Sequence, residues 1–301
     1  MLAKLITRLK MIRARTANVL TMNKRNLNYI YPSNLRPDFP CADNKLLTKK
    51  MLEDCDVTVP NTLLSYSSFY ELSTLADDLA CHNDFVIKPA SGSGGGGILV
   101  FINKEAEHWI TPGGKRFTLA DIKKHITDII FGVYSFGLSD DAIIEQRITQ
   151  HPEITRLSPY GLADVRLIVY RHQPIMCMAR IPTLASDGKA NLHQGAIGLG
   201  IDIKSGVSQH AILIDSDISH HPDTNEALIN QQIPHWDRVI EMSSIAARKA
   251  PLKYLGIDIS ISDSGPVLLE INVRPGLQIQ NANQKGMRNM LEVTRLKGEQ
   301  Q

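Results

Sequence analysis

The sequence predicts an α+β fold, because segments with the pattern of antiparallel hairpins outnumber regular strand–helix–strand units. In each hairpin, two mainly apolar runs are separated by a stretch of glycine, serine or other polar residues. The paired runs are 85–89 with 98–101, 165–170 with 174–181, 197–203 with 208–214, and 254–262 with 266–274. We therefore expect sheets that are mainly antiparallel.

The segments between these hairpins are expected to form helices, one further strand and loops. Residues 43–55 alternate apolar and basic positions as a surface helix does, and Val57 to Leu64 continues in extended form. The other expected elements are helices at about 119–130 and 235–249, a strand at 142–148 and a loop at 182–195.

The composition is that of a globular protein with a real core. Hydrophobic residues make up 43% and charged residues 21% of the 301-residue chain, which excludes disordered and fibrous classes. Residues 1–37 contain eight Lys or Arg and no acid. The rest of the chain contains the other 25 of the 33 basic residues and all 31 acidic ones. Nucleic-acid binding usually needs a basic domain rather than a basic tail, so we expect no nucleic-acid partner.

The cysteine pattern indicates neither a metal ribbon nor a disulfide scaffold. The four cysteines are widely spaced and form no Cys-x-x-Cys pair; they are Cys41, Cys55, Cys81 and Cys177. No apolar run approaches the roughly 20 residues of a membrane-spanning helix, and the N-terminus lacks the features of a signal peptide. We therefore expect a cytoplasmic location.

The N-terminal residues have the pattern of a basic amphipathic helix. Apolar residues recur at helical spacing, at Leu2, Leu5, Ile6, Leu9 and Ile12. Basic residues surround them, at Lys4, Arg8, Lys10, Arg13 and Arg15. Two interpretations stay open: a helix packed on the body of the protein, or attachment of residues 1–25 to an acidic membrane surface or a protein partner.

The last hairpin carries a candidate metal site. Glu270 and Asn272 lie two apart on a strand and so share a face, and Asp258 lies on the partner strand. Two carboxylates and an amide oxygen without His or Cys favour Mg²⁺ or Mn²⁺ over Zn²⁺. A solvated strand face is the alternative; Arg274, just beyond, favours a site that also binds phosphate.

The glycine-rich turn after the strand at 85–89 is a candidate phosphate lid. Lys88 ends that strand, and glycines at 92 and 94–97 would let backbone N–H groups approach phosphate oxygens. The pattern is neither a Walker A loop nor a Rossmann fingerprint, because a strand follows it. A plain flexible turn is the alternative.

Two further groups of residues have weaker signals. Glu145 and Gln146 end an apolar strand that could offer backbone groups to an adenine edge, with Glu153 a candidate for the ribose; a charged strand edge is the alternative. Arg166 and Arg180 lie on facing strands, where two guanidinium groups suit phosphate or carboxylate oxygens, although surface arginines are often structural.

Taken in order, these motifs resemble the ATP-grasp superfamily over about residues 43–280. The residues that carry the resemblance are Lys45, Lys88 with its glycines, Glu145, Asp164-Val-Arg166, Met178-Ala-Arg180-Ile-Pro182, Asn191-Leu-His-Gln-Gly195, Asp258 and Glu270-Ile-Asn272. Within the superfamily the chain is most similar to the alpha-L-glutamate ligase-like branch, which is related to the ribosomal-protein glutamate ligases. Family members usually have a full α/β domain first, whereas about 40 residues stand there in this chain.

The resemblance implies two α+β subdomains, 43–144 and 145–301, that hold a nucleotide, with a basic arm at 1–42. ATP would be bound by Lys45, Lys88, Ser91, Gly92, Ser93, Gly94, Gly95, Gly96, Glu145, Gln146, Ile148 and Glu153. Two Mg²⁺ ions would be bound by Asp258, Glu270 and Asn272. The transferred phosphoryl group and the acceptor would be held by Arg166, Arg180, Asn191 and Arg274.

The activity that the resemblance implies is ATP-dependent amide formation. A substrate carboxylate attacks the γ-phosphate, and an amine displaces phosphate from the acyl phosphate. The substrates would be an amino acid or peptide carboxylate and an amine, and a partner protein or a second copy of the chain is the candidate to complete the acceptor site. Phosphate transfer to a stable acceptor and a nucleotide-binding module without turnover are the alternatives.

Overall fold

The computed structural model describes residues 16–92 and 94–298. Two compact units form: a large unit of residues 1–42, 50–58 and 150–301, and a small unit of residues 43–49 and 59–149. The predicted amphipathic helix before residue 16 and the predicted phosphate contact of Ser93 lie outside the described residues. No helix among the described residues is long and apolar enough to cross a membrane.

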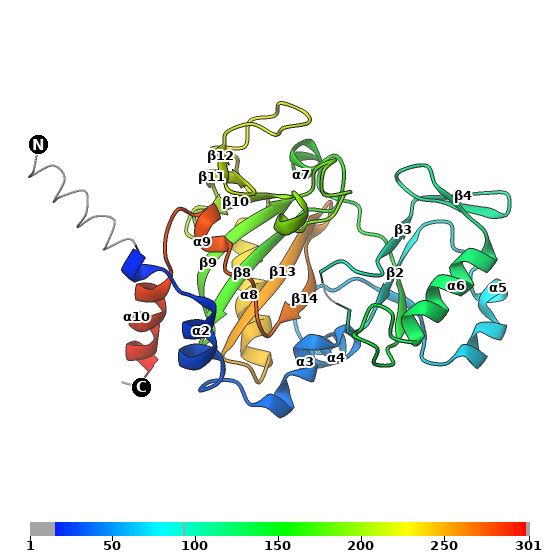
Figure 1. The fold of residues 1–301 in the computed structure, drawn as a ribbon, viewed down its shortest axis with the longest axis horizontal. Coiled ribbons are helices and arrows are strands. Elements are labelled where there is room, and N and C mark those ends of the chain that lie inside the picture. Colours follow the sequence, from blue (N-terminus) through cyan, green and yellow to red (C-terminus); the bar gives the residue numbers. More distant parts are fainter. Residues whose placement is uncertain (1–15, 93, 299–301) are drawn as a thin grey trace, which may run out of the picture. The chain divides into compact units, whose positions relative to one another are not determined.

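The small unit contains two antiparallel sheets (Figure 1). The first has the order β1 (Thr62–Tyr66), β7 (Ala142–Glu145), β2 (Phe85–Pro89) and β3 (Leu99–Phe101). The second consists of β4 (Asn103–Glu105), β5 (His108–Ile110) and β6 (Arg116–Phe117). The helical elements in the sequence from 40 to 130 are α3 (Pro40–Asp43), α4 (Lys45–Leu52), the 3₁₀ turn Phe69–Ser73, α5 (Leu75–Asp78) and α6 (Leu119–Ile130).

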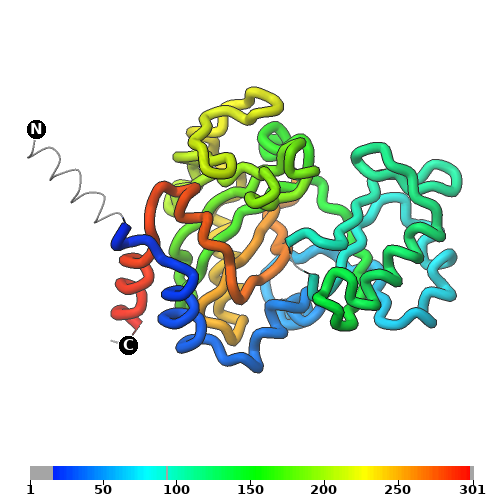
Figure 2. Tube along the Cα trace, viewed as in Figure 1, coloured from blue at the N-terminus to red at the C-terminus, as the bar shows by residue number. Residues whose placement is uncertain are grey.

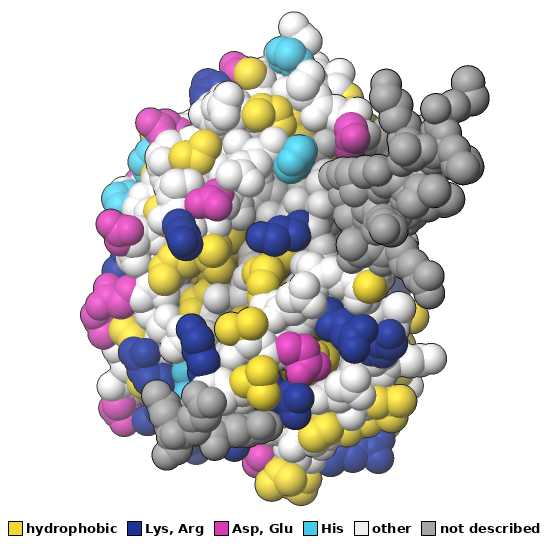
Figure 3. All heavy atoms as spheres, turned by 90° about the vertical axis from the view of Figure 1, so that its left-hand side faces the viewer, with side chains coloured by type: hydrophobic (Ala, Val, Ile, Leu, Met, Phe, Trp, Pro, Cys, Tyr) yellow, Lys and Arg dark blue, Asp and Glu magenta, His cyan; other side chains and the backbone are white. Residues whose placement is uncertain are grey.

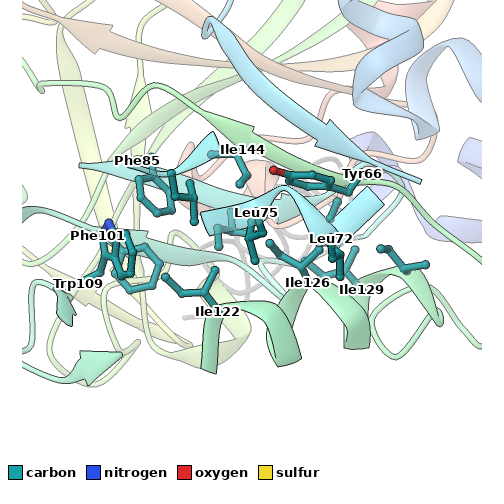
Figure 4. Close-up of a cluster of buried hydrophobic side chains, with 14 residues drawn as sticks. Tyr66, Leu72, Leu75, Phe85, Phe101, Trp109, Ile122, Ile126, Ile129 and Ile144 are labelled. Carbon is teal, nitrogen blue, oxygen red and sulfur yellow. The ribbon is translucent and has the colours of Figure 1, made fainter. Parts of the chain in front are cut away.

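Helix α6 forms because its sequence supplies both a start signal and an apolar face. Thr118 and Asp121 form a capping box at its N-terminus. Ile122, Ile126 and Ile129 are spaced to share one face, and all three are fully buried. They lie in one cluster with the aromatic side chains of the sheets, as Figure 4 shows. This core fixes the sheet that carries Lys88 and Glu145.

The large unit is built on a seven-stranded antiparallel sheet (Figure 1). Its strands, from edge to edge, are β12 (Ser216–Ile218), β11 (Ser208–Leu213), β10 (Ile197–Ile201), β9 (Gln173–Ile181), β8 (Asp164–Tyr170), β13 (Tyr254–Ser262) and β14 (Gly265–Asn272). Helix α8 (Trp236–Lys249) packs on β8, β9, β13 and β14. The shorter helical elements are α2 (Met22–Arg25), the π-helix Asn26–Ile30, α7 (Pro152–Leu157), α9 (Ile279–Ala282) and α10 (Arg288–Gly298).

The first described residues run beside the last ones within the large unit, as the blue and red segments of Figure 2 show. Leu20 N donates to Gln280 Oε1 over 2.8 Å, and Tyr29 Oη donates to Glu292 Oε1 over 2.7 Å. The Tyr29 ring also packs edge-on against Tyr170, with ring centroids 5.5 Å apart.

On the face with α10, basic side chains are interspersed with hydrophobic and acidic ones (Figure 3).

The predicted hairpins are confirmed, since each predicted pair of strands is hydrogen-bonded in antiparallel register. The strand predicted at 142–148 is too long: β7 ends at Glu145, and Gln146 is exposed beyond it. The strand predicted at 266–274 ends at Asn272. The short strands β4 to β6 and helix α10 are absent from the sequence prediction.

Candidate active site

Four neighbouring strands of the large unit bring charged side chains to one face of the sheet. Residues paired across antiparallel strands point to the same side. Arg180 pairs with Asp164, Arg166 pairs with Asp258, and Asp258 pairs with Glu270. We name this set, together with Asn272, the carboxylate–arginine cluster.

The two guanidinium groups of the cluster converge on Asp258. Arg166 donates from Nε to Asp258 Oδ1 over 2.7 Å and from Nη2 to Oδ2 over 2.5 Å. Arg180 donates to both oxygens of Asp164 over 2.6 Å and reaches Asp258 Oδ2 over 2.8 Å. The sequence-based expectation that Arg166 and Arg180 lie together is confirmed by these contacts.

Burial and the arginines together separate the pKa values of the two aspartates. Burial alone would raise the pKa of Asp258, but Arg166 and Arg180 more than offset it and hold that pKa well below its usual range. For Asp164, burial is the largest effect and raises the pKa, although Arg180 opposes it. Asp258 therefore stays ionised at neutral pH and keeps both guanidinium groups in place.

Glu270 and Asn272 complete the cluster at the end of β14. Asn272 Nδ2 lies 3.2 Å from Asp258 Oδ2 and 3.3 Å from Glu270 Oε1, so the amide bridges the two carboxylates. The Glu270 side chain is 30% exposed, whereas that of Asp258 is 1% exposed. Solvent and ligands therefore reach the cluster on the side of Glu270.

The donor set fits magnesium rather than a transition metal. Among the described residues, no three His, Cys, Asp or Glu side chains are arranged to hold a metal ion. Within the cluster, Asp258, Glu270 and Asn272 instead offer two carboxylates and one amide, the hard oxygen donors that Mg²⁺ accepts with water and phosphate oxygens. The Asn272 amide bridges two negative groups at the point where a cation would relieve their repulsion.

A second charged group lies in the small unit, around the buried Glu145. Lys88 Nζ is 2.5 Å from Glu145 Oε2, and Lys49 Nζ forms an ion pair with Glu145 Oε1. Lys49 also donates to Pro60 O and Thr62 Oγ1, each over 2.7 Å. Burial lowers the pKa of Lys49 in spite of Glu145. Two amines are thus held at the end of β2 by one carboxylate.

Lys45 contacts the backbone of the glycine segment, and its predicted contact with phosphate stays a prediction. Lys49 is a residue that the sequence prediction misses. Lys45 Nζ donates to the backbone oxygens of Gly92, over 2.9 Å, and Ala90, over 3.4 Å, so it braces the glycine segment (residues 91–97). Lys49 follows one helical turn later in α4 and lies beside Lys88 through Glu145. Its spacing of four from Lys45 was the available signal.

The glycine segment is tied down at both ends while its middle depends on glycine. Ser91 N donates to both oxygens of Asp140 over 3.0 Å, and Gly97 O contacts His125 Nε2 at 2.9 Å. Gly94 and Gly95 have positive φ, which other residues rarely adopt. The segment is therefore a backbone-lined turn on fixed supports.

The sequence matches a family described as sugar-transfer associated ATP-grasp over residues 24–295. The chain belongs to this family. The match confirms the predicted superfamily and its α+β fold, and it does not single out the glutamate ligase-like branch. No curated protein matches the sequence.

Solved ATP-grasp structures resemble the chain at low identity. The PsnB ligase complexed with precursor peptide PsnA2 and AMPPNP is 15% identical, with a TM-score of 0.43, over 88% of this chain and 59% of its own. The D-alanine–D-alanine ligase of Bacillus anthracis complexed with ATP is 14% identical, with a TM-score of 0.45, over 87% and 69%. D-cycloserine synthetase DcsG is 13% identical, with a TM-score of 0.45, over 85% and 70%. This ATP-grasp chain thus spans about three fifths of PsnB.

The remaining residues expected at an ATP-grasp site are not part of the carboxylate–arginine cluster. Asn191 Oδ1 accepts a hydrogen bond from His193 N over 3.0 Å and so caps a short 3₁₀ turn. Glu153 is exposed in α7, which belongs to the large unit, whereas Glu145 belongs to the small unit. Ile148 follows β7 and is half-buried. Their predicted contacts with substrate stay predictions.

Asp140 is a second residue that the sequence prediction misses, and replacing it with Ala should loosen the glycine segment. Its buried carboxylate also accepts hydrogen bonds from Ser135 Oγ and Asp141 N. Leaving these donors unpaired costs about 1–3 kcal/mol locally. We expect proteolytic cleavage at 91–97 to become about tenfold faster or more. Asp141→Ala, which keeps the backbone bond to Ala90, is the matched control, and equal cleavage of both variants would contradict the anchoring role.

Proposed function

We propose that the protein is an ATP-dependent ligase that activates a substrate carboxylate as an acyl phosphate and joins it to an amine. The observation that carries the proposal is the carboxylate–arginine cluster within a member of the ATP-grasp family. Phosphoryl transfer requires positioning and charge stabilisation more than covalent chemistry, so oxygen donors and guanidinium groups suffice.

In this proposal the cluster holds the reacting end of the nucleotide. Asp258, Glu270 and Asn272 would bind up to two Mg²⁺ ions, which offset charge on the phosphate oxygens. Arg166 and Arg180 keep Asp258 ionised and would supply cationic groups where negative charge develops. The substrate carboxylate oxygen attacks the γ-phosphorus, the bond from this phosphorus to the β,γ-bridging oxygen breaks, and ADP leaves. The amine then attacks the acyl carbon, phosphate leaves, and the amine loses a proton.

The small unit would bind the rest of ATP. Lys88 and Lys49 carry the amines for phosphate contact, and Glu145 holds both in position. The glycine segment presents backbone N–H groups, and the chain at 145–148 would bind adenine. Glu153 stays the candidate for the ribose and Lys45 a candidate for phosphate contact, and Lys45 also supports the glycine segment.

The proposed substrates are glutamate or a similar amino acid and an amine on a peptide, protein or small molecule, in a cytoplasmic enzyme. This part of the proposal rests on the resemblance of the ordered motifs between Lys45 and Asn272, taken together, to the glutamate ligase-like branch. A kinase that phosphorylates a stable acceptor is the second candidate, because the same cluster would support it.

Hydroxylamine separates these candidates, because it converts an acyl phosphate into a stable hydroxamate. With MgATP and a set of amino acids, we expect hydroxamate and ADP in equal amounts with the correct carboxylate, and an amide when an amine replaces hydroxylamine. Formation of a stable phosphorylated product without hydroxamate would support a kinase. Two results together would contradict the ligase: ADP forms when no carboxylate is added, and no carboxylate in the screen gives a product.

A further inference from the structure

Arg25 is a buried cation whose hydrogen bonds with the described residues are all to neutral groups. It ends α2, and its residue is 6% exposed. Its Nη1 donates to Pro275 O over 2.6 Å, and its Nε and Nη2 donate to Asn26 Oδ1 over 3.1 and 2.9 Å. A guanidinium group has five N–H donors. Three hydrogen bonds to the described residues therefore leave donors for another acceptor.

No carboxylate balances this charge in the described part of the chain. Arg25 forms no ion pair with a described residue, and residues 1–15 contain no Asp or Glu. Burial is the main cause that lowers the pKa of Arg25, and Arg274 lowers it further. A buried guanidinium beside a second one is costly unless an anion approaches both.

Arg274 supplies the second cation from the turn after β14. Its guanidinium carbon lies 5.2 Å from the centre of the Phe39 ring, and its side chain makes no ion pair with the described residues. Arg25 bonds to the carbonyl of Pro275, the next residue in the chain. Gly256 allows Pro275 to pack closely on β13, because a Cβ at Gly256 would lie 2.5 Å from Pro275 Cβ. The turn that carries Arg274 is therefore fixed on both sides.

A buried hydroxyl lies in the same electrostatic environment. Tyr254 is fully buried, and its Oη has no hydrogen-bond partner among the described residues. Arg25 and Tyr254 interact electrostatically. A buried hydroxyl without a partner among the described residues retains the capacity to bond to a small polar group.

We propose that Arg25 and Arg274 form a subsite for an oxyanion, the carboxylate or phosphate group of the acceptor substrate. Arg274 follows Asn272 of the carboxylate–arginine cluster by two residues, and Arg25 belongs to the same unit. Guanidinium forks bind both kinds of oxyanion well. The assignment of the anion to a substrate rests on the proposed function; the binding itself does not.

Anion binding by the full chain without nucleotide tests the subsite. Thermal unfolding is followed with rising phosphate in one series and rising acetate in another, with sodium chloride keeping the ionic strength constant. We expect saturable stabilisation of the wild type by at least one anion, from which a Kd follows. Stronger binding of phosphate or of acetate identifies the anionic group. Absence of saturable stabilisation by both overturns the proposal.

Variants show whether the two arginines bind the anion. Arg274 is exposed, so the Arg274→Gln variant should fold. We expect its Kd for the anion to rise about tenfold or more. Arg25→Lys keeps the charge but loses the fork, and its Kd should rise as well. Arg248→Gln, on an exposed position of α8, should bind as the wild type does. An unchanged Kd in Arg274→Gln overturns the subsite, and an unchanged Kd in Arg25→Lys excludes Arg25 from it. A protein that forms hydroxamate yet fails these tests keeps the proposed function and loses only the subsite.

Discussion

Glu270→Gln is expected to lower Mg-dependent ADP release by more than about 100-fold. Removing a group that only supports a metal ligand costs at most about 100-fold, so a direct ligand should cost more. The substitution keeps the size of the side chain and removes one of the two carboxylates of the predicted metal site. Because the Glu270 side chain is 30% exposed, the fold should be retained. Release of ADP at saturating MgATP, with the thermal midpoint measured in parallel, checks both statements.

Glu241→Gln is the matched control, since Glu241 lies on α8 with its side chain 59% exposed. It should release ADP at the wild-type rate. A Glu270→Gln variant that folds and retains more than half of the wild-type rate would disprove the metal assignment. Raising the Mg²⁺ concentration should restore part of the lost rate if Glu270 binds the ion, because weaker binding is offset by mass action.

Asp258→Ala is expected to destabilise the large unit by about 3–5 kcal/mol, because Arg166 and Arg180 would stay buried without their shared carboxylate. The two tryptophans of the chain allow a clean measurement. Trp109 lies in the small unit and Trp236 in the large unit, so a Trp109→Phe background reports the unfolding of the large unit alone. Urea titration of Trp236 fluorescence gives the change in the free energy of unfolding.

Asp187→Asn controls for the loss of one negative charge, because the Asp187 side chain is 92% exposed and Asn tolerates its backbone φ of 52°. We expect this surface change to lower the free energy of unfolding by less than about 0.5 kcal/mol. The loss in the free energy of unfolding of Asp258→Asn should lie between those of the surface control and Asp258→Ala. Asn keeps the shape of the side chain and two acceptor sites. A loss below about 1 kcal/mol in Asp258→Ala would mean that the arginines find solvent and that the cluster is not a buried electrostatic unit.

The face of the sheet that carries the cluster could be predicted because strand periodicity is local. Glu270 and Asn272 share a face by spacing alone. The register set by the tight turn at 263–265 would place Asp258 opposite Leu269, and a β-bulge between Asp258 and Ile259 moves Asp258 opposite Glu270, which spacing does not predict. The arginines follow from the same alternation on β8 and β9. The roles of these residues in catalysis are not tested by the fold and stay predictions.

Features that depend on distant contacts could not be predicted in this way. The strands β4 to β6 are two or three residues long and show no periodicity to detect. The role of Arg25 depends on Pro275, 250 residues later. Lys49 and Asp140 are polar residues whose neighbours become apparent only when the strands around them are assembled, although Lys49 had a helical spacing from Lys45 as a signal.

The pairing of the first described residues with the last ones has a consequence for synthesis on the ribosome. The small unit is complete once residue 149 has emerged, so it can fold early. The large unit must wait, because Leu20 and Tyr29 are held by Gln280 and Glu292. Residues 20–29 therefore stay without these partners until residues 280–292 have emerged, and a chain released before residue 280 would lack both contacts.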